Sequence, residues 1–302
     1  MRLSLTISTT FILLVTVILL GCKNATNNQA ANEGTLYISV DETFKPVIEE
    51  QVKVFLSQND KANIVIHYKS EAECLEDFAK DSVNMVLIAR GLTDKEDDAY
   101  RNNLGYPVRF GILAYDAVAL LTNVNAKDSI YTLQQLHQIL SGADSSVKVV
   151  LDGNRATSTV RYLQDSVLKG KPFGKNVQAA SGSKAVLDYI AATPNSIGFV
   201  GSSWVNNLQD KAQLAYFNKI RLALLPCGVC QEKDAYAKPA QSTIMYGQYP
   251  LVRPLYYLLK ENNPGVGTTF LNFMSLEKGQ LIFRRAYVVP GKMYFGRRTS
   301  IL

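Results

Sequence analysis

The segment LDGNRATSTVRYLQD, residues 151 to 165, decides how the rest of the chain is interpreted. Its small polar run ATST lies between Arg155 and Arg161 and opens a stretch whose apolar residues have helical spacing. Hydroxyl side chains cap the first N–H groups of a helix, and the helix dipole favours a negative charge beside the others. A guanidinium on the first turn adds the donors that a tetrahedral oxyanion requires. We therefore predict an anion-binding helix start; an ordinary Ser/Thr cap with a solvent-facing arginine is the alternative.

The length and the charge of the chain narrow its class. With 302 residues it can bury one large core or two smaller ones. The net charge of +6 favours anionic ligands by steering, but the basic residues are scattered along the chain. Because the sequence has no basic run with interleaved aromatic residues, we expect no nucleic-acid partner.

The N-terminus has the pattern of a secretory leader. Arg2 is followed by an uncharged stretch whose apolar part, residues 11 to 20, is short for a membrane span and typical of a signal peptide. The run LLGC that ends at Cys22 resembles the bacterial lipobox, in which the cysteine is lipid-modified and becomes the new N-terminus. We predict a signal peptide over 1–21 and a polar, lipidated tether over 22–33, outside the cytoplasm; a plain signal anchor is the alternative.

Three further cysteines are compatible with an oxidising compartment. Cys74 falls in a predicted helix, where we expect it to be a small buried residue. Cys227 and Cys230 form a CxxC without a second pair or a neighbouring histidine, so zinc is disfavoured and a local disulfide is the preferred interpretation. A thioredoxin-like redox pair is the weaker alternative. We expect neither a metal nor a cofactor.

Strand and helix patterns alternate along the first third of the chain. Strand-like runs at 36–40, 64–68 and 84–89 are separated by helix-like runs at 44–55 and 72–79. This order predicts a parallel sheet with helices on both faces and ligands at the carboxyl ends of its strands. Three side chains occupy such positions: Thr43, Ser70 and Arg90. Thr43 is also expected to cap the 44–55 helix, and Thr93 with Glu96 resembles a capping box.

A second alternation runs from about residue 126 to residue 225, and two helices are predicted at 266–275 and 276–285. Two alternations, each with an anion-friendly loop, suggest two lobes that face one cleft. We predict an α/β fold with lobe 1 formed by 34–122 plus 240–302 and lobe 2 by 123–239. Arg253 is expected to have a structural role, pairing with an acid near the hinge.

Several stretches, taken in order, resemble the phosphate-binding proteins of ABC phosphate importers, which are type II periplasmic binding proteins. The stretches are GTLYISVDETFKPVIEE, IHYKSEAEC, VLIARGLT, TLQQLHQILSG, ATSTVRYL, ATPNSIGFV and YPLVRPLYY. The resemblance covers nearly the whole mature chain. It implies two lobes, each a mixed sheet flanked by helices, with the ligand in the cleft between them.

The resemblance also implies a set of ligand contacts: Thr43 and Phe44 through backbone N–H groups, Ser70, Thr157, Ser158 and Thr159, with Arg90 and Arg161 as added guanidinium groups. This chain departs from the family at three places. Arg90 stands where the family commonly has an aspartate, Gly153 stands roughly where it has an arginine, and residues 71–73 (EAE) replace its glycines. Asp41 and Asp152 are the candidates to accept a proton from a bound hydrogen phosphate.

The preferred hypothesis is therefore a monomeric lipoprotein, anchored to a membrane of the cell envelope, that binds inorganic phosphate or a related oxyanion and delivers it to the permease subunits of an ABC importer. An enzyme such as a phosphoester hydrolase is disfavoured, because the sequence offers no metal cluster and no nucleophile–His–acid set. The second alternative is a sensor of the same fold with altered specificity, because Glu71 and Glu73 would repel an anion.

Overall fold

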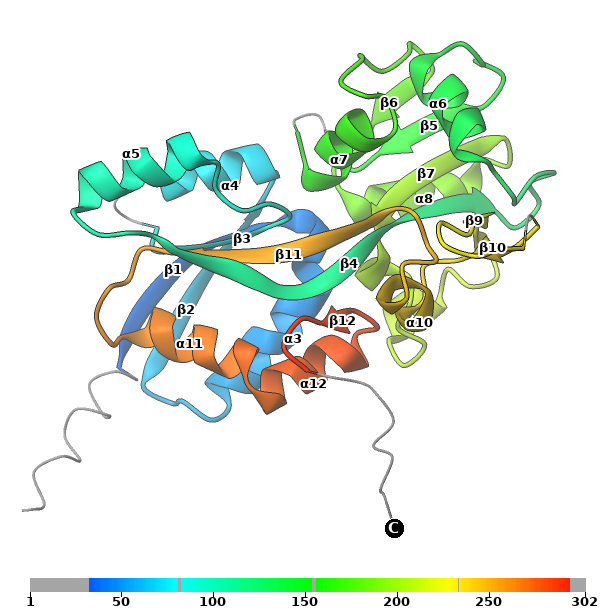
Figure 1. Cartoon of the computed structure of the whole chain (residues 1–302). Helices are drawn as coiled ribbons and strands as arrows, with labels where there is room; N and C mark the ends of the chain where they lie inside the picture. The colour runs from blue at the N-terminus through cyan, green and yellow to red at the C-terminus, as the bar shows by residue number, and fades with distance from the viewer. Residues whose placement is uncertain (1–32, 81–82, 154–155, 233, 294–302) are drawn as a thin grey trace, which may run out of the picture.

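The computed structural model describes residues 33–80, 83–153, 156–232 and 234–293. The signal peptide, Cys22 and the tether predicted from the sequence lie outside these residues. Figure 1 shows two lobes connected by long strands. Within the part of the chain that the structure describes, no helix combines the length and the apolarity needed to cross a bilayer.

Lobe 1 is built on a mixed sheet in the order β2-β1-β3-β11-β4, with β12 added to β4. The parallel pairs β1–β2 and β1–β3 are followed by the antiparallel pairs β3–β11 and β11–β4. The strands and helices of this lobe are β1 (Gly34–Asp41), η1 (Glu42–Phe44), α3 (Lys45–Leu56), β2 (Ala62–Lys69), α4 (Glu71–Phe78), β3 (Met85–Ile88), α5 (Asp94–Leu104), β4 (Arg109–Asn123), β11 (Val252–Leu259), α11 (Val266–Ser275), α12 (Glu277–Arg285) and β12 (Val289–Pro290).

Lobe 2 continues the sheet in the order β4-β7-β5-β6, with β8 also paired to β4. Here β4–β7 is antiparallel, whereas β5–β7 and β5–β6 are parallel. Its elements are α6 (Leu133–Ser141), β5 (Lys148–Leu151), α7 (Ser158–Ser166), β6 (Val177–Ala179), α8 (Ser183–Ala192), β7 (Ser196–Gly201), η2 (Ser202–Trp204), α9 (Lys211–Leu214), β8 (Ile220–Leu222), β9 (Leu225–Pro226), β10 (Tyr236–Ala237) and α10 (Gln241–Met245). Mixed strand pairing flanked by helices in each lobe confirms the predicted fold class.

The strand β4 belongs to both lobes. Its pairing with β11 extends to Ala117, and its pairing with β7 begins at Val118. In the sequence the apolar runs 111–114 and 117–121 are separated by Tyr115 and Asp116, and the structure has one continuous strand over both. A single strand that is shared by the two lobes gives the molecule a natural hinge.

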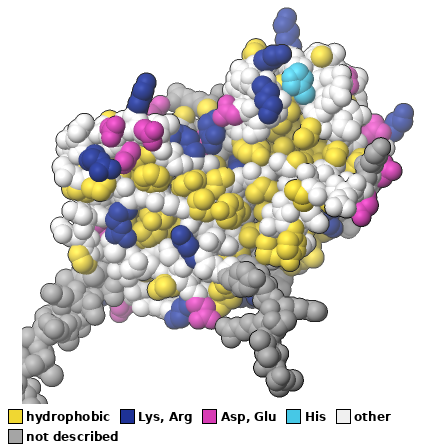
Figure 2. All heavy atoms as spheres, in the orientation of Figure 1, with side chains coloured by type: hydrophobic (Ala, Val, Ile, Leu, Met, Phe, Trp, Pro, Cys, Tyr) yellow, Lys and Arg dark blue, Asp and Glu magenta, His cyan; other side chains and the backbone are white. Residues whose placement is uncertain are grey.

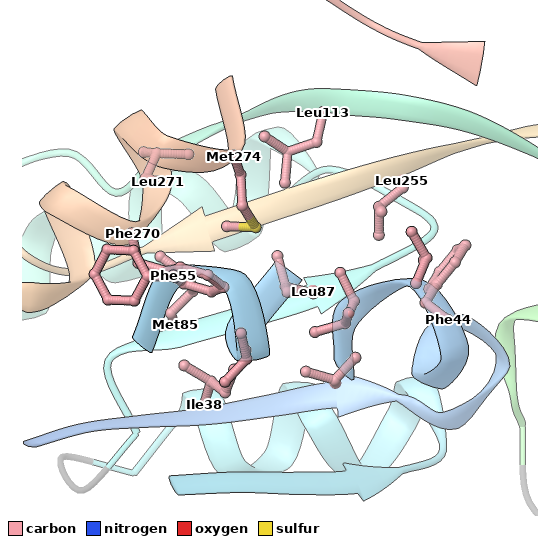
Figure 3. Close-up of a cluster of buried hydrophobic side chains, with 14 of the residues drawn as sticks. Ile38, Phe44, Phe55, Met85, Leu87, Leu113, Leu255, Phe270, Leu271 and Met274 are labelled. Carbon is pink, nitrogen blue, oxygen red and sulfur yellow. The ribbon is translucent and has the colours of Figure 1, made fainter. Parts of the chain in front are cut away.

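Each lobe has its own hydrophobic core. In lobe 1 the sheet packs against α3 and α11 through Phe55, Phe270 and Met274, as Figure 3 shows, and Phe283 of α12 belongs to the same cluster. The other face of the sheet packs against α4 and α5. In lobe 2 one cluster includes side chains of α6 and α7, and a second includes side chains of α8. Ile244 of α10 packs in the lobe 2 cluster although the sequence assigns 240–302 to lobe 1. The packing of α10 thus differs from that assignment, and the exact lobe boundaries stay a prediction.

The connection between the lobes leaves apolar side chains in contact with solvent. Figure 2 shows hydrophobic side chains gathered over β4 and β11 and near α10. Phe110 and Tyr115 of β4, together with Met245 and Tyr246 at α10, are exposed. One face of the hinge region is thus not covered by a helix layer.

Local capping explains several helix starts that position the site. Ser70 and Glu73 form a capping box at the start of α4, and the predicted capping box of Thr93 and Glu96 opens α5. The predicted cap of Thr43 on the 44–55 helix is wrong. Asp41 caps the 3-10 turn η1 instead, and Phe44 precedes α3 without a side-chain cap. The hydroxyl of Thr43 is therefore available for contacts with lobe 2.

Candidate anion-binding site between the lobes

The end of β1 meets the start of α7 at the junction of the two lobes. The carboxylate of Asp41 accepts a hydrogen bond from the N–H of Thr43 (2.9 Å) and one from the N–H of Ser158 (2.8 Å). Thr43 belongs to lobe 1 and Ser158 is the first residue of α7, so one buried carboxylate joins the lobes. The acceptor at this helix start is a carboxylate of the chain itself, so the binding of an anionic ligand here stays a prediction.

Hydroxyl groups from both lobes meet beside Asp41. The Oγ1 atom of Thr43 lies 3.1 Å from the Oγ atom of Ser158, although the two residues are 115 positions apart in the chain. Thr157 caps α7 by accepting from the N–H of Val160, and its hydroxyl donates to Asp152 at 2.7 Å. Thr43, Thr157, Ser158 and Thr159 are all buried. The structure therefore brings together the hydroxyl residues that the sequence singles out in two distant segments.

Arg253 provides the guanidinium of this cluster. Its Nη1 atom donates to the Oγ atom of Ser158 (2.8 Å) and to the Oγ1 atom of Thr159 (3.1 Å). Its Nη2 atom donates to Asp116 at 3.1 Å, and the side chain is 1% exposed. The structure thus confirms the predicted pairing with an acid near the hinge, but sequence reasoning missed that the same guanidinium contacts the α7 hydroxyls.

Two further contacts fix the orientation of Arg253. Asp116 also accepts a hydrogen bond from Ser202 at 2.5 Å, and Arg253 pairs with Asp116 in the register of β11 and β4. The guanidinium carbon lies 4.9 Å from the centre of the Phe44 ring, which is a cation–π geometry. Among the described residues, the Nε atom of Arg253 has no hydrogen-bond partner. The buried guanidinium beside Ser158 therefore keeps one N–H group, at Nε, that can donate a further hydrogen bond.

Arg161 and Glu71 form a second contact between the lobes. Arg161 of α7 donates through Nε to the carboxylate of Glu71, and its Nη2 atom lies 3.3 Å from the other oxygen. The N–H of Ala89, just after β3, donates to the same carboxylate at 2.9 Å. Arg161 therefore takes part in a contact between the lobes, where its partner is a carboxylate of the chain itself, and its ligand role stays a prediction.

Arg90 and Ser70 are engaged within lobe 1. Arg90 forms a bidentate pair with Glu96, with both N–O distances 2.8 Å, and also donates to the carbonyl of Gly91. The Ser70 hydroxyl donates to Glu73 at 2.7 Å and accepts from the N–H of Glu73. The structure does not bring either side chain into hydrogen-bond contact with the hydroxyl cluster. Their ligand roles stay predictions.

Glu42 makes a third contact from lobe 1 to a helix start of lobe 2. Its carboxylate accepts from the N–H of Ser183 (3.2 Å) and from the Ser183 hydroxyl (2.8 Å). The added Cβ of a residue at Gly182 would lie 3.2 Å from that carboxylate. Sequence reasoning missed this contact, although the run Ser181-Gly182-Ser183 before a helical pattern is a visible signal of a helix start.

Burial controls the ionisation of the acids in the cluster. Burial, together with the charge of Glu71, raises the pKa of Asp41 against the opposing effect of Arg253. Burial raises the pKa of Asp152 to about 7, with Asp41 adding to the rise and the Thr157 hydroxyl opposing it. The site thus contains one carboxyl group that gains or loses a proton near neutral pH, which suits it to exchange a hydrogen bond with a protonated oxyanion.

The raised pKa of Asp152 predicts a specific pH dependence of stability. Below about pH 4 the side chain is protonated in both the folded and the unfolded chain. Between about pH 4 and pH 7 only the folded chain keeps the proton, so its contribution to stability falls as the pH rises and is lost above pH 7. Asp152→Asn keeps an oxygen that accepts from Thr157 and removes this loss. We expect its Tm to match wild type at pH 4.5 and to exceed it by roughly 5 °C or more at pH 8 in thermal melts. The same difference at both pH values would contradict this assignment.

The cysteines agree with the sequence analysis. Cys227 and Cys230 form a disulfide, with a Cα–Cα distance of 5.5 Å. Cys74 is a buried free thiol in α4, and burial raises its pKa. Within the described ranges, no group of three or more His, Cys, Asp or Glu side chains is arranged to hold a metal ion.

A cavity of about 820 Å³ lies beside Glu42 and Lys184, near the contact of η1 with α8. Residues of α3, α8, α9 and α12 line it, and it reaches Glu42 and Trp204, whose indole N–H donates to the Thr43 carbonyl at 3.1 Å. Thr43, Ser158 and Arg253 do not line this cavity. The hydroxyl cluster is thus separate from this cavity.

Comparison with known proteins shows the family to which this chain belongs. The profile described as the PBP superfamily domain matches residues 25–277, which is most of the chain. The chain belongs to the PBP superfamily. Its two lobes, joined by β4 and β11 with polar groups converging between them, are thus those of a PBP-superfamily binding protein.

Two curated relatives align with this chain over most of their length, with about a fifth of the aligned residues identical. The phosphate-binding protein PstS of Borreliella burgdorferi is 20% identical over 288 residues, which cover 89% of this chain and 92% of that protein. The phosphate-binding protein PstS of Pseudomonas aeruginosa is 23% identical over 258 residues, which cover 76% of each chain.

Solved structures show the same fold. A chain from Clostridium perfringens, described as a phosphate ABC transporter substrate-binding protein with bound phosphate, superposes with a TM-score of 0.71 at 20% identity. The match covers 85% of this PBP-superfamily chain and 99% of that one. An ABC-type phosphate transport receptor from Vibrio cholerae superposes with a TM-score of 0.63 at 14% identity, over 85% of this chain and 100% of that one. At these identities the likeness concerns the fold.

Proposed function

We propose that this protein is an extracytoplasmic solute-binding protein that captures inorganic phosphate between its lobes and delivers it to an ABC importer. The observation that carries the proposal is the convergence of Thr43 from lobe 1, Ser158 from lobe 2 and the buried guanidinium of Arg253. The curated relatives, named as phosphate-binding proteins, support the choice of ligand.

The chemistry of the cluster suits a small oxyanion. Hydroxyls, helix-start N–H groups and guanidinium groups replace the hydration of an anion with charge-assisted hydrogen bonds, each contributing on the order of 1.5–3 kcal/mol. Several such bonds reach micromolar affinity, which corresponds to roughly −8 kcal/mol. The buried acids Asp41 and Asp152 accept hydrogen bonds from a protonated oxyanion, so they favour hydrogen phosphate over sulfate, which carries no proton at neutral pH.

Lobe movement provides access to this site. The lobes meet through Asp41, Glu42 and Glu71, and the segments around β4 and β11 connect them in the chain. In the proposed cycle the lobes open about this hinge, an oxyanion replaces the internal contacts, and closure excludes water and presents a composite surface to the permease subunits. Lipidation at Cys22 would keep a monomeric protein at the membrane, facing the periplasm, through the 22–33 tether.

A sensor with altered oxyanion specificity is the second candidate function. Glu71 favours it, because a buried carboxylate on Arg161 opposes the approach of a dianion. A transport protein and a sensor would share the same ligand site. They would differ in the partner protein that binds the closed, ligand-bound form.

Titration calorimetry at neutral pH tests the proposed ligand. We expect micromolar or tighter binding of phosphate and arsenate and at least 100-fold weaker binding of sulfate. Ser158→Ala should weaken phosphate binding at least tenfold, because it removes a hydroxyl held by Arg253. Ser57→Ala, at an exposed serine that ends α3, serves as the matched control and should bind as wild type. No heat with phosphate, sulfate, molybdate or arsenate would overturn the proposal.

A further inference from the structure

The side chain of Glu71 is buried at the junction of the lobes without serving its own helix. It is the first residue of α4, yet Ser70 and Glu73 already complete the capping box at that helix start. The Glu71 side chain is 3% exposed. Its carboxylate reaches instead to β3 and α7, where the N–H of Ala89 and the guanidinium of Arg161 donate to it. Helix capping therefore does not explain its position.

The partners of Glu71 are those that an oxyanion would take. A main-chain N–H at the carboxyl end of a strand and a two-pronged guanidinium are a donor set for a carboxylate or for a phosphate. The N–H of Ala72 also donates to the carbonyl of Ala156 at 3.3 Å, so α4 and the segment before α7 are in direct contact. The carboxylate thus fills the gap that would otherwise separate these donors.

Glu71 also acts on the hydroxyl cluster at a distance. Its negative charge raises the pKa of Asp41, the carboxylate that joins Thr43 to Ser158. An oxyanion that enters beside Asp41 therefore meets the field of Glu71 as well. This repulsion grows with the charge of the ligand.

We propose that Glu71 is a tethered anion that holds the oxyanion donors of Arg161 and Ala89, so that an incoming oxyanion binds by displacing it. The inference rests on the proposed function and goes beyond it by naming the residue that limits affinity. Glu71 then works as a built-in competitor, which lowers the affinity for every oxyanion and lowers it most for dianions.

The test compares phosphate binding by calorimetry in wild type, Glu71→Gln and Glu76→Gln. The first substitution keeps the size of the side chain and removes its charge. Glu76 is exposed on the same helix, so its replacement changes the net charge equally without touching Arg161. We expect Glu71→Gln to bind inorganic phosphate at least tenfold more tightly than wild type and Glu76→Gln to match wild type. Adding Arg161→Ala to Glu71→Gln should cancel the gain.

Each outcome separates this inference from the proposed function. Wild type that binds phosphate with an affinity equal to or higher than that of Glu71→Gln overturns the role of Glu71 and leaves the proposed function intact. Tight binding by Glu71→Gln alone supports the role of Glu71 and contradicts phosphate capture by the native chain. Absence of binding in both overturns both. Glu71→Ala, checked by circular dichroism, provides a second uncharged variant should the glutamine variant fold poorly.

Discussion

Replacing Arg253 with methionine is expected to produce the largest combined loss of stability and binding. The substitution leaves Asp116 as a buried carboxylate with Ser202 as its remaining side-chain partner among the described residues. Removing one partner of a buried ion pair costs about 3–5 kcal/mol of folding free energy. For a chain of this size we expect Tm to fall by roughly 10 °C in a thermal melt. Phosphate binding should fall at least 100-fold, because Ser158 and Thr159 lose their guanidinium donor.

Two companion variants distinguish the structural from the ligand-binding contribution of Arg253. The double variant Arg253→Met, Asp116→Leu removes both buried charges and should recover much of the lost Tm, while phosphate binding stays absent. Arg253→Lys keeps the charge, but a lysine cannot contact the α7 hydroxyls and Asp116 with the same geometry. We therefore expect this variant to bind phosphate weakly. Phosphate affinity that follows Tm across all three variants would contradict a direct role for Arg253.

Gly201→Ala is expected to cause the second-largest effect on binding. Gly201 ends β7 in lobe 2, and an added Cβ would lie 2.7 Å from the main-chain carbonyl of Thr43 in lobe 1. Its φ of −61° accepts any residue, so the substitution introduces a steric conflict between the lobes without backbone strain. The obstacle is a main-chain oxygen, which cannot rotate away as the end of a side chain can. We therefore expect the two lobes of the variant to close incompletely. Phosphate affinity should fall at least 30-fold by calorimetry, with Tm changed by only a few degrees.

A glycine away from the junction provides the control for this variant. The Cβ added at Gly111 in β4 would have the Tyr257 side chain as its nearest neighbour, at 3.2 Å, and an aromatic side chain adjusts more readily than backbone. Gly111→Ala should bind phosphate as wild type does. A radius of gyration from small-angle scattering that stays larger with phosphate for Gly201→Ala than for wild type would support blocked closure, and equal values with equal affinities would refute it.

Local sequence patterns were sufficient for most of the fold. The apolar spacing of Val47, Ile48, Val52 and Phe55 predicts α3 and its buried face, and the structure buries all four. The capping box at Thr93 and the disulfide of Cys227 with Cys230 are also as predicted. These features depend on residues a few positions apart, where spacing and side-chain chemistry are read directly.

The candidate site was predicted only in part, because its contacts join distant segments. The hydroxyl run at Thr157 indicates a helix start. Arg253, however, lies 95 residues from Ser158, and only the course of β11 in the folded chain brings the two side chains together. Asp116 lies within β4, and nothing in the local sequence pairs it with Arg253, 137 positions away. Arg90 pairs with Glu96 and Arg161 pairs with Glu71. A helical pattern in the sequence does not indicate which donors a nearby carboxylate will bind.

The structure of the protein crystallised with arsenate would test the central claim most directly. Arsenic scatters anomalously, so its position does not depend on interpreting the shape of the density. The account predicts an anomalous peak between the lobes, with arsenate oxygens within hydrogen-bonding distance of Ser158 and Arg253. A peak at saturating arsenate that lies away from both residues would contradict it.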